Sequence, residues 1–241
     1  MLTPEKKEML YEGKAKQVYA TQDPSTVIVY FKDDATAFNG KKKSQIHGKG
    51  IINNTLSSLL YPYLEEKGVK THFLRQLSDR EMLVYAVDII PLEVIVRNVA
   101  AGSMARNMGI EEGKIMKKPI VEYSFKKDEL GDPMVSEDHI IALEWATEEQ
   151  VSSIRAAALK VNQVLVELME KAGLTLVDFK LEFGLKEAEV LLADEISPDT
   201  CRLWDIKTGE VMDKDRFRKD LGQVAEHYQE VLDRVKKALN A

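Results

Sequence analysis

The segment at residues 176–184, LVDFKLEFG, constrains this chain more than any other, because apolar and polar side chains alternate along it. Such alternation predicts a β-strand with one buried face and one polar face. The predicted apolar face carries Val177, Phe179, Leu181 and Phe183, and the predicted polar face carries Asp178, Lys180 and Glu182. Gly184 can begin a turn, and residues 190–196 read as a second strand that returns beside the first.

Pairing of the two strands would bring Asp194 and Glu195 back toward Lys180 and Glu182. Carboxylates would then outnumber the single lysine on a half-buried surface, which is costly unless a cation is bound there. Mg²⁺ suits such a place, since it takes one or two carboxylates together with phosphate oxygens. The segment therefore predicts a metal–phosphate site, and the alternative is a solvated sheet face with ordinary charge pairs.

Length and composition bound the class of protein. A chain of 241 residues fits one large domain or two lobes that share a cleft. The net charge of −6 argues against a general nucleic-acid binder. Cys201 is the single cysteine, and no Cys/His cluster suggests zinc. We expect neither a signal peptide nor a membrane span from this sequence, and therefore a cytoplasmic protein.

The N-terminal part is predicted to be a mixed lobe of strands with one helix. Residues 9–19 read as strand, glycine turn and strand, with Lys14 and Lys16 shortly after Gly13. Backbone amides at such a turn can approach a phosphate, although an ordinary hairpin with solvated lysines has the same pattern. Residues 33–40 read as an acidic loop, and residues 51–67 have helical spacing. The boundary with the second lobe is expected between Met82 and Leu92.

The second informative stretch is residues 89–103. A largely apolar strand ends near Arg97, and a helix is predicted to begin near Gly102-Ser103 and to run through Met108. An arginine at a strand end beside a helix N-terminus is suited to binding an anion. An arginine salt bridge with Ser103 as the helix N-cap explains the residues equally well.

Later segments supply further candidates and covering helices. Residues 109–119 read as a loop and residues 120–125 as a strand, followed by a turn in which Asp132 precedes Pro133. Asp132 either points into a cleft or is a simple turn residue. Residues 147–172 read as a long amphipathic helix. Arg202 is a second candidate arginine for an anion, and helices in residues 213–220 and 223–239 read as structural covering.

Four motifs together resemble the SAICAR synthetase family of purine biosynthesis, in its bacterial single-function form. They are YEGKAK at residues 11–16, PLEVIVRNVAAGS at 91–103, VDFKLEFG at 177–184 and DEISPDTCRLWD at 194–205. The resemblance runs from residue 10 to about residue 221. It implies an ATP- and Mg²⁺-dependent ligase that joins the carboxylate of the ribonucleotide CAIR to the amine of L-aspartate, giving SAICAR, ADP and phosphate.

The resemblance also implies an architecture. We expect an α+β fold with two lobes and a kinase-like or ATP-grasp-like nucleotide cleft between them. The N-terminal lobe, residues 1–86, would be a mostly antiparallel sheet that binds ATP. The larger α/β lobe, residues 87–241, would hold the metal, the ribonucleotide and aspartate. A homodimer is common in the family.

Roles pass to this chain only where a motif matches. The resemblance assigns Gly13, Lys14, Lys16, Glu182 and Asp194 to the nucleotide. It assigns Glu182, Asp194 and Asp132 to the metal, and Arg97, Ser103 and Arg202 to the phosphate of CAIR. Lys14, Lys180 and Asp178 are the expected catalytic residues, with Asp178 toward the imidazole side. Asn39 stands where some members have aspartate, so it is a substrate-binding candidate but not a general base.

Two other functions use the same residue types. A small-molecule kinase would also combine a Gly-Lys turn with a carboxylate–metal pair in a two-lobed fold, and aspartate-dependent release of ADP separates the two enzymes. A non-catalytic nucleotide-binding regulator would bind ATP without turnover. The combination of Lys14, Lys180, Glu182 and Asp194 argues against the regulator, because simple binding does not need such a metal cluster.

Overall fold

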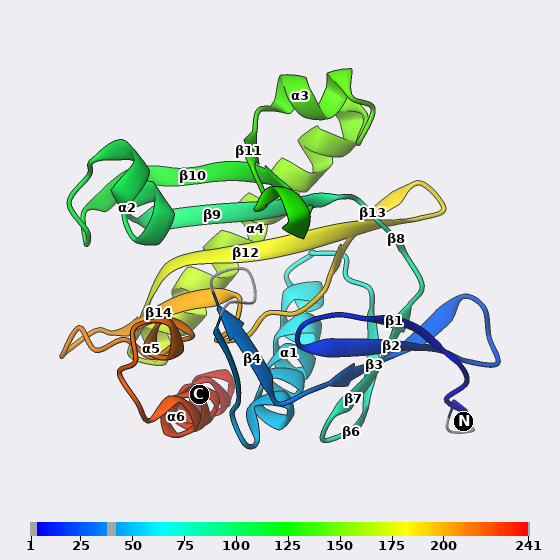
Figure 1. Cartoon of the computed structure of the whole chain (residues 1–241), viewed down its shortest axis with the longest axis horizontal. Helices are drawn as coiled ribbons and strands as arrows, with labels where there is room; N and C mark the ends of the chain where they lie inside the picture. Colours follow the sequence, from blue (N-terminus) through cyan, green and yellow to red (C-terminus); the bar gives the residue numbers. More distant parts are fainter. Residues whose placement is uncertain (1–3, 38–41, 241) are drawn as a thin grey trace.

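The computed structural model describes residues 4–37 and 42–240, and they form the predicted α+β fold (Figure 1). A first antiparallel sheet has the strand order β1-β2-β3-β7-β6. Its strands are β1 (Met9–Glu12), β2 (Lys16–Ala20), β3 (Thr26–Phe31), β6 (Phe73–Ser78) and β7 (Glu81–Tyr85). The predicted strand–glycine turn–strand is therefore confirmed as β1 and β2, which pair directly.

A second, larger antiparallel sheet has the order β11-β10-β9-β12-β13, and β14 and β8 also pair with β12. Its strands are β8 (Asp88–Ile89), β9 (Leu92–Val99), β10 (Ile115–Phe125), β11 (Met134–Val135), β12 (Leu174–Lys186), β13 (Glu189–Ala193) and β14 (Cys201–Asp205). The strand predicted from residues 176–184 is β12, which lies between β9 and β14 over part of its length and pairs with β13 farther along.

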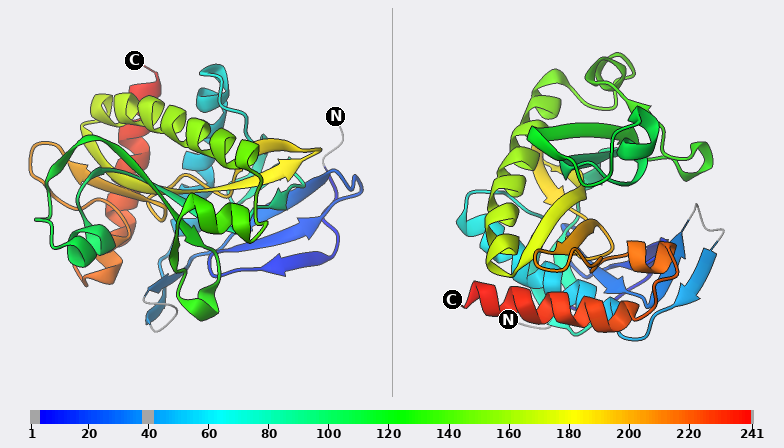
Figure 2. Two further views of the ribbon diagram at one scale, coloured as in Figure 1. Left: turned by 90° about the horizontal axis from the view of Figure 1, so that it is seen from above. Right: turned by 90° about the vertical axis from the view of Figure 1, so that its left-hand side faces the viewer.

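The helices cover both sheets. They are α1 (Lys49–Glu66), α2 (Gly102–Met108), the short 3-10 helix η1 (Asp128–Leu130), α3 (Glu137–Ala142), α4 (Glu148–Lys171), α5 (Asp215–Arg218) and α6 (Val224–Leu239). Figure 2 shows α4 running along the second sheet, while α6 lies beside α1. Every helix in the described residues is too short or too polar to cross a lipid bilayer.

The long helix α4 begins and ends where its sequence predicts. The side chain of Thr147 accepts a hydrogen bond from the backbone of Gln150, and the Gln150 side chain accepts one from the Thr147 backbone. This capping box satisfies amides that the first turn cannot pair internally. Gly173 follows the helix with φ of 73°, a conformation that favours glycine.

A bulge changes the predicted faces of β12. The register with β14 shifts between Leu176 and Asp178, so an extra residue stands at Val177. Phe179, Leu181 and Phe183 join the main core as predicted. The assignment of Val177 to that face is wrong, because its side chain packs in a separate cluster with Val99, Ala101 and Trp204.

Two stretches predicted as loops contain strands. Residues 33–40 include β4 (Asp34–Ala37), which pairs with β5 (Lys42–Gln45) as a separate ribbon, and β10 begins at Ile115 within residues 109–119. None of the side chains at residues 115–119 is buried, and β4 contributes Ala35 as its buried side chain among residues 34–36, so these stretches lack a clear apolar alternation. The helix predicted from residues 213–220 is shorter, since α5 spans only Asp215–Arg218.

One apolar core extends under both sheets. It includes Phe31 and Met82 of the first sheet, Leu60 of α1, and Val94 and Phe179 of the second sheet. A parallel bridge between Thr71 and Leu192 links the edge of the first sheet to β13. The strands change from one sheet to the other between Tyr85 and Asp88, within the expected interval. The division into residues 1–86 and 87–241 stays a prediction.

Candidate active site

A polar row crosses neighbouring strands of the second sheet. The register places Asp178 of β12 opposite Arg97 of β9 on one side and opposite Arg202 of β14 on the other. Lys180 and Glu182 follow at alternate positions of β12, so their side chains leave the same face as Asp178. Antiparallel pairing thus places the polar side chains of β12 next to those of β9 and β14. We call this set of side chains the polar row, and the opposite face of β12 packs on the apolar core.

Two arginines and a serine meet at one end of this row. Arg97 Nη1 donates to Asp178 Oδ2 at 2.8 Å, and Arg202 Nη1 donates to both oxygens of Asp178 at 2.9 and 2.8 Å. Arg97 Nη2 also donates to Ser103 Oγ at 3.2 Å. The structure therefore brings Arg97, Ser103, Arg202 and Asp178 together. Ser103 is not the helix cap, because Ala101 occupies that position.

The start of α2 is shaped to let Arg202 approach. Gly102 has φ of 57°, and a Cβ placed on it would lie 2.5 Å from Arg202 Nη2. A side chain at this position would displace the guanidinium, so glycine is required by both conformation and space. Arg97, the other arginine of this group, is almost completely buried, with 3% of its surface exposed.

Further charged groups in this cluster were missed by the sequence analysis. Arg97 Nε donates to Glu122 of β10 at 2.5 Å, and Arg202 Nε donates to Asp215 of α5 at 2.9 Å. Arg218 also reaches Asp215, at 2.5 Å. Burial alone would lower the pKa of Arg202, but Asp178 and Asp215 outweigh it and hold that pKa above its usual range. The alternation of side chains in the predicted strand 120–125 is the sequence feature that could have identified Glu122 as part of a polar face.

A lysine–carboxylate cluster occupies the middle of the polar row. Lys180 Nζ lies 2.9 Å from Glu182 Oε1 and 2.7 Å from Glu93 Oε1, and Lys126 makes a second ion pair with Glu182. Burial alone would lower the pKa of Lys180, but Glu182 and Glu93 raise it well above the ordinary value. Lys180 is therefore a fixed positive charge rather than a proton carrier near neutral pH.

The first sheet supplies a lysine to the end of β13. Lys16 of β2 forms ion pairs with Asp194 and, at 3.0 Å, with Glu195. The last residue of β13, Ala193, pairs with Glu182. Asp194 directly follows Ala193 and has φ of 64°. Burial would raise the pKa of Asp194, but Lys16 and Lys180 hold it below the usual range. Glu182, Asp194 and Lys16 thus lie in one electrostatic cluster.

The expectation of a single lysine among these carboxylates is wrong. Lys16 and Lys126 come from distant parts of the chain and join Lys180, so the chain itself offsets much of the negative charge. Within the described residues, no group of three or more His, Cys, Asp and Glu side chains is arranged to hold a metal. Glu182 and Asp194 remain a pair of carboxylates, which suits Mg²⁺ only if phosphate or water supplies its other ligands.

Three predicted residues stand apart from this cluster. Gly13 closes the β1–β2 turn by donating its amide to the carbonyl of Lys16 at 2.8 Å, while Lys14 extends to Asp128 of η1 at 2.6 Å. Asp132 accepts a hydrogen bond from the amide of Lys127 at 2.9 Å, so it closes its own turn. Asn39 lies outside the described residues.

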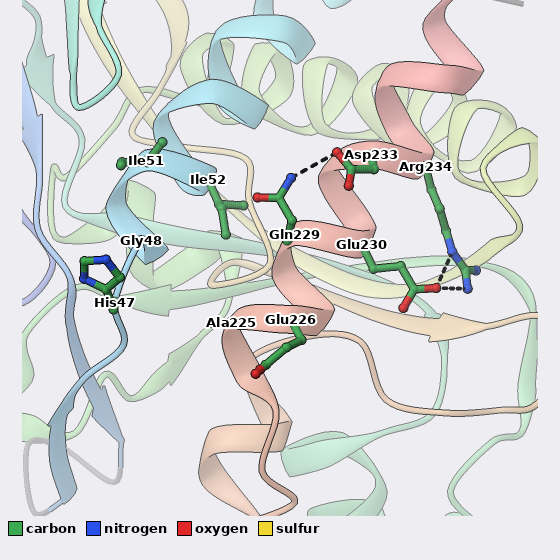
Figure 3. A pocket seen from close by; sticks show the side chains of 10 residues that line it. All are labelled: His47, Gly48, Ile51, Ile52, Ala225, Glu226, Gln229, Glu230, Asp233 and Arg234. Atoms are coloured by element: carbon green, nitrogen blue, oxygen red, sulfur yellow. Dashed lines mark hydrogen bonds and ion pairs between the residues drawn. The ribbon is translucent and has the colours of Figure 1, made fainter.

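A separate open cavity of about 710 Å³ lies between the start of α1 and α6 (Figure 3). Its lining includes Ile51 and Ile52 of α1 and the acidic residues Glu226, Glu230 and Asp233 of α6. None of the candidate lysines, arginines or carboxylates described above lines it. The site assembled on the polar row is therefore defined by its ion pairs and not by this cavity.

Comparisons with known proteins agree with the motifs and the fold. The family model of SAICAR synthetase matches residues 9–235. A phosphoribosylaminoimidazole-succinocarboxamide synthase of Clostridium acetobutylicum is 59% identical over 96% of this chain and 98% of its own. The corresponding enzyme of Ehrlichia chaffeensis has a solved structure with a TM-score of 0.93 and 51% identity, covering 95% of this chain and 98% of that one.

A SAICAR synthetase solved in complex with ADP is also similar, with a TM-score of 0.91 and 46% identity over 95% of this chain and 97% of that one. The match of the family model covers nearly the whole chain, and both the sequence relative and the solved structures are matched over almost their full length. Since sequence, fold and motifs agree, this chain belongs to the SAICAR synthetase family.

Proposed function

We propose that this protein uses ATP to join the carboxylate of CAIR to the amine of L-aspartate, forming SAICAR, ADP and phosphate in purine biosynthesis. The observation that carries the proposal is the polar row with two charged ends. Arg97 and Arg202 lie at one end, and Lys16 with Asp194 lies at the other. A phosphorylated nucleotide and a phosphorylated ribonucleotide can thereby be held on one surface.

The nucleotide belongs at the end where the two sheets meet. Lys16 projects from the first sheet toward carboxylates of the second, and Gly13 and Lys14 form the adjacent turn. We infer a cleft between the lobes of residues 1–86 and 87–241, with the ATP phosphates near Lys14 and Lys16. The ADP bound by the related SAICAR synthetase supports nucleotide binding in this fold.

Glu182 and Asp194 would hold Mg²⁺ together with phosphate oxygens, since two carboxylates leave coordination positions for a substrate. The ion would neutralise charge on the phosphates when bound. Asp132 is a further candidate, although reaching the pair would require it to release the amide of Lys127. Lys16, Lys126 and Lys180 orient these carboxylates in the protein itself.

The ribonucleotide belongs at the arginine end. Arg97, Arg202 and Ser103 present donors around Asp178, and planar guanidinium groups match phosphate oxygens geometrically. Asp178 holds both arginines in place. We also propose that Asp178 faces the imidazole ring of bound CAIR. Asn39 stays a candidate for contact with a substrate, on sequence grounds alone.

The chemistry must activate a carboxylate, which by itself is a poor electrophile toward an amine. We infer that a carboxylate oxygen of CAIR attacks the γ-phosphorus of ATP, so the bond from that phosphorus to the bridging oxygen of ADP breaks. The amine of aspartate then attacks the acyl carbon and loses a proton to the leaving phosphate or to water, and phosphate departs with the oxygen that had carried the phosphoryl group. Lys14, Lys16 and Lys180 contribute by positioning and charge neutralisation.

An isotope experiment tests this route. With ¹⁸O in both carboxylate oxygens of CAIR, we expect one labelled oxygen in the released phosphate and the other in the SAICAR amide. Mass spectrometry of phosphate and SAICAR measures both. Unlabelled phosphate formed together with normal SAICAR would exclude the acyl phosphate. Omitting aspartate separately tests the kinase alternative, because a kinase acting on CAIR would still release ADP.

Replacing Lys14 with alanine should mainly weaken the use of ATP. A lysine on a phosphate provides a charge-assisted contact, and its loss is expected to lower kcat/KM for ATP about tenfold. KM for CAIR should change little. Lys127→Ala is a control, since Lys127 also carries an exposed ammonium paired with an acidic residue of η1. Unchanged ATP kinetics in a folded Lys14→Ala protein would remove Lys14 from the site.

We further propose that the enzyme acts in the cytoplasm as a homodimer on small molecules, without binding nucleic acid or membranes. The net charge of −6 supports the exclusion of nucleic acid, whose phosphates such a surface would repel on average. The homodimer is proposed from the resemblance of the sequence motifs to the family. Sedimentation equilibrium at micromolar concentration would test it, and a mass of one chain would reject the dimer.

A further inference from the structure

Glu195 is a buried carboxylate that the proposed reaction leaves without a role. Its side chain is 4% exposed, although it directly follows Asp194 at the end of the nucleotide site. One oxygen, Oε1, lies 3.0 Å from Lys16 Nζ, and the other, Oε2, accepts a hydrogen bond from Ser197 Oγ at 2.7 Å. A buried charge with both oxygens engaged is held in a fixed position.

Ser197 is itself held in place by the loop that follows. Its Oγ accepts a hydrogen bond from the amide of Asp199 at 3.1 Å, so the hydroxyl proton is directed to Glu195. The Asp199 carboxylate is anchored by Lys49 Nζ at 2.5 Å and by the Tyr228 hydroxyl at 2.8 Å. Helices α1 and α6 thereby fix the loop from which Glu195 projects.

If Asp194 binds the metal, a second carboxylate is required to hold the Lys16 ammonium in place. In the structure the Lys16 ammonium is shared between Asp194 and Glu195. An Mg²⁺ ion on Asp194 would take an oxygen that now faces the ammonium and would repel the ammonium itself. Glu195 lies deeper and can keep its contact with Lys16, because its orientation depends on Ser197 and not on Asp194.

We propose that Glu195, oriented by Ser197, is a positioning residue that holds the Lys16 ammonium against the phosphates of the nucleotide while Asp194 is engaged by the metal. The inference rests on the nucleotide role proposed for Lys16. Protein kinases provide a physical parallel, since there a lysine that binds ATP phosphates must be paired with a glutamate for activity. Glu195 acts through Lys16 and need not touch a substrate.

A double-mutant cycle on Mg²⁺-ADP binding tests the inference without requiring turnover. We would measure the dissociation constant of Mg²⁺-ADP by calorimetry for wild type, Glu195→Gln, Lys16→Met and the double variant. Glu195→Gln should weaken binding about tenfold when Lys16 is present and less than twofold in the Lys16→Met background. CAIR binding should stay within about twofold of wild type throughout. Equal losses of ADP affinity in both backgrounds would overturn the proposal.

Two further variants keep the test decisive. Ser197→Ala should weaken ADP binding about threefold, again only when Lys16 is present, and it decides the matter if Glu195→Gln does not fold. Ser57→Ala is the matched control, since Ser57 Oγ hydrogen-bonds the backbone of Ile196 in the same loop but makes no hydrogen bond to Glu195 or Lys16. Any loss from Ser57→Ala should be the same in both backgrounds, as expected for a structural effect.

The readouts also separate this inference from the proposed reaction. Absence of SAICAR formation by the wild-type enzyme would refute the reaction, yet the ADP-binding cycle would still report on Glu195 and Lys16. If Glu195 were instead a metal ligand, Glu195→Gln would change the Mg²⁺ dependence of ADP binding even in the Lys16→Met background. That outcome would reject the positioning role.

Discussion

Replacing Glu182 with glutamine is expected to reduce the rate of SAICAR formation at saturating substrates by about a hundredfold or more. The Glu182 carboxylate is almost fully buried and faces both Lys126 and Lys180. A neutral amide would leave these ammonium groups with one fewer negative partner and would weaken the pair of carboxylates proposed to hold Mg²⁺. Losses of this size are typical when one charge-stabilising group is removed from an active site.

The measurement is steady-state turnover as a function of Mg²⁺ concentration, with thermal melting to verify folding. Glu93→Gln is a matched control, because Glu93 also pairs with Lys180, at 2.7 Å, but is not a proposed metal ligand. It should cost only a few-fold in rate and leave the Mg²⁺ dependence unchanged. A normal rate and normal Mg²⁺ dependence in Glu182→Gln would mean that the hairpin of β12 and β13 is structural only.

The alternation of residues 176–184 predicted the central strand and its polar side chains, but not the position of Val177. An apolar residue inserted at a bulge looks the same in sequence as one more step of the alternation. Leu176 and Phe179 both belong to the main core, with Val177 packed elsewhere. Only the pairing with β14 reveals the shift, because the bulge exists relative to a partner strand.

Charge balance at the site could not be predicted from local pattern. Lys16 and Asp194 are separated by 178 positions in the chain, and Lys126 and Glu182 by 56. A strand pattern shows which side chains share a face, but the cations opposite them depend on how the two sheets pack. Unbalanced carboxylates therefore do not by themselves indicate a metal here. The Glu182–Asp194 pair and the family resemblance do.

The sequence predicts the two arginines of the cluster, but it does not predict how they are arranged around a common partner. Arg97 and Arg202 are candidate anion-binding residues because each lies near small residues and turns, and the family motifs include both. Their common partner, Asp178, follows from the register of three strands, which the sequence does not specify. The sequence predicts that Asp215 lies in a covering helix, because its charged neighbours in residues 213–220 resemble a solvated surface.

The central position of Asp178 leads to a prediction with effects on both stability and activity. Asp178→Asn should lower the free energy of unfolding by about 3–5 kcal/mol, the usual cost of breaking a buried ion pair by removing one partner. The variant amide presents donors toward Arg97 and Arg202, which are donors themselves. Both guanidinium groups should therefore lose their alignment, and KM for CAIR should rise about 10- to 100-fold.

Chemical denaturation and steady-state kinetics with each substrate varied in turn measure these effects. Asp205→Asn is the matched control, because Asp205 lies on β14 and accepts from Arg234 Nη1 at 2.7 Å, with no hydrogen bond or ion pair to Arg97 or Arg202. It should reduce stability while leaving KM for CAIR unchanged, since its arginine is not part of the polar row. If Asp178→Asn lost stability but kept wild-type KM for CAIR and for ATP, Asp178 would be a structural residue. The arginines would then bind the ribonucleotide without its help, or not at all.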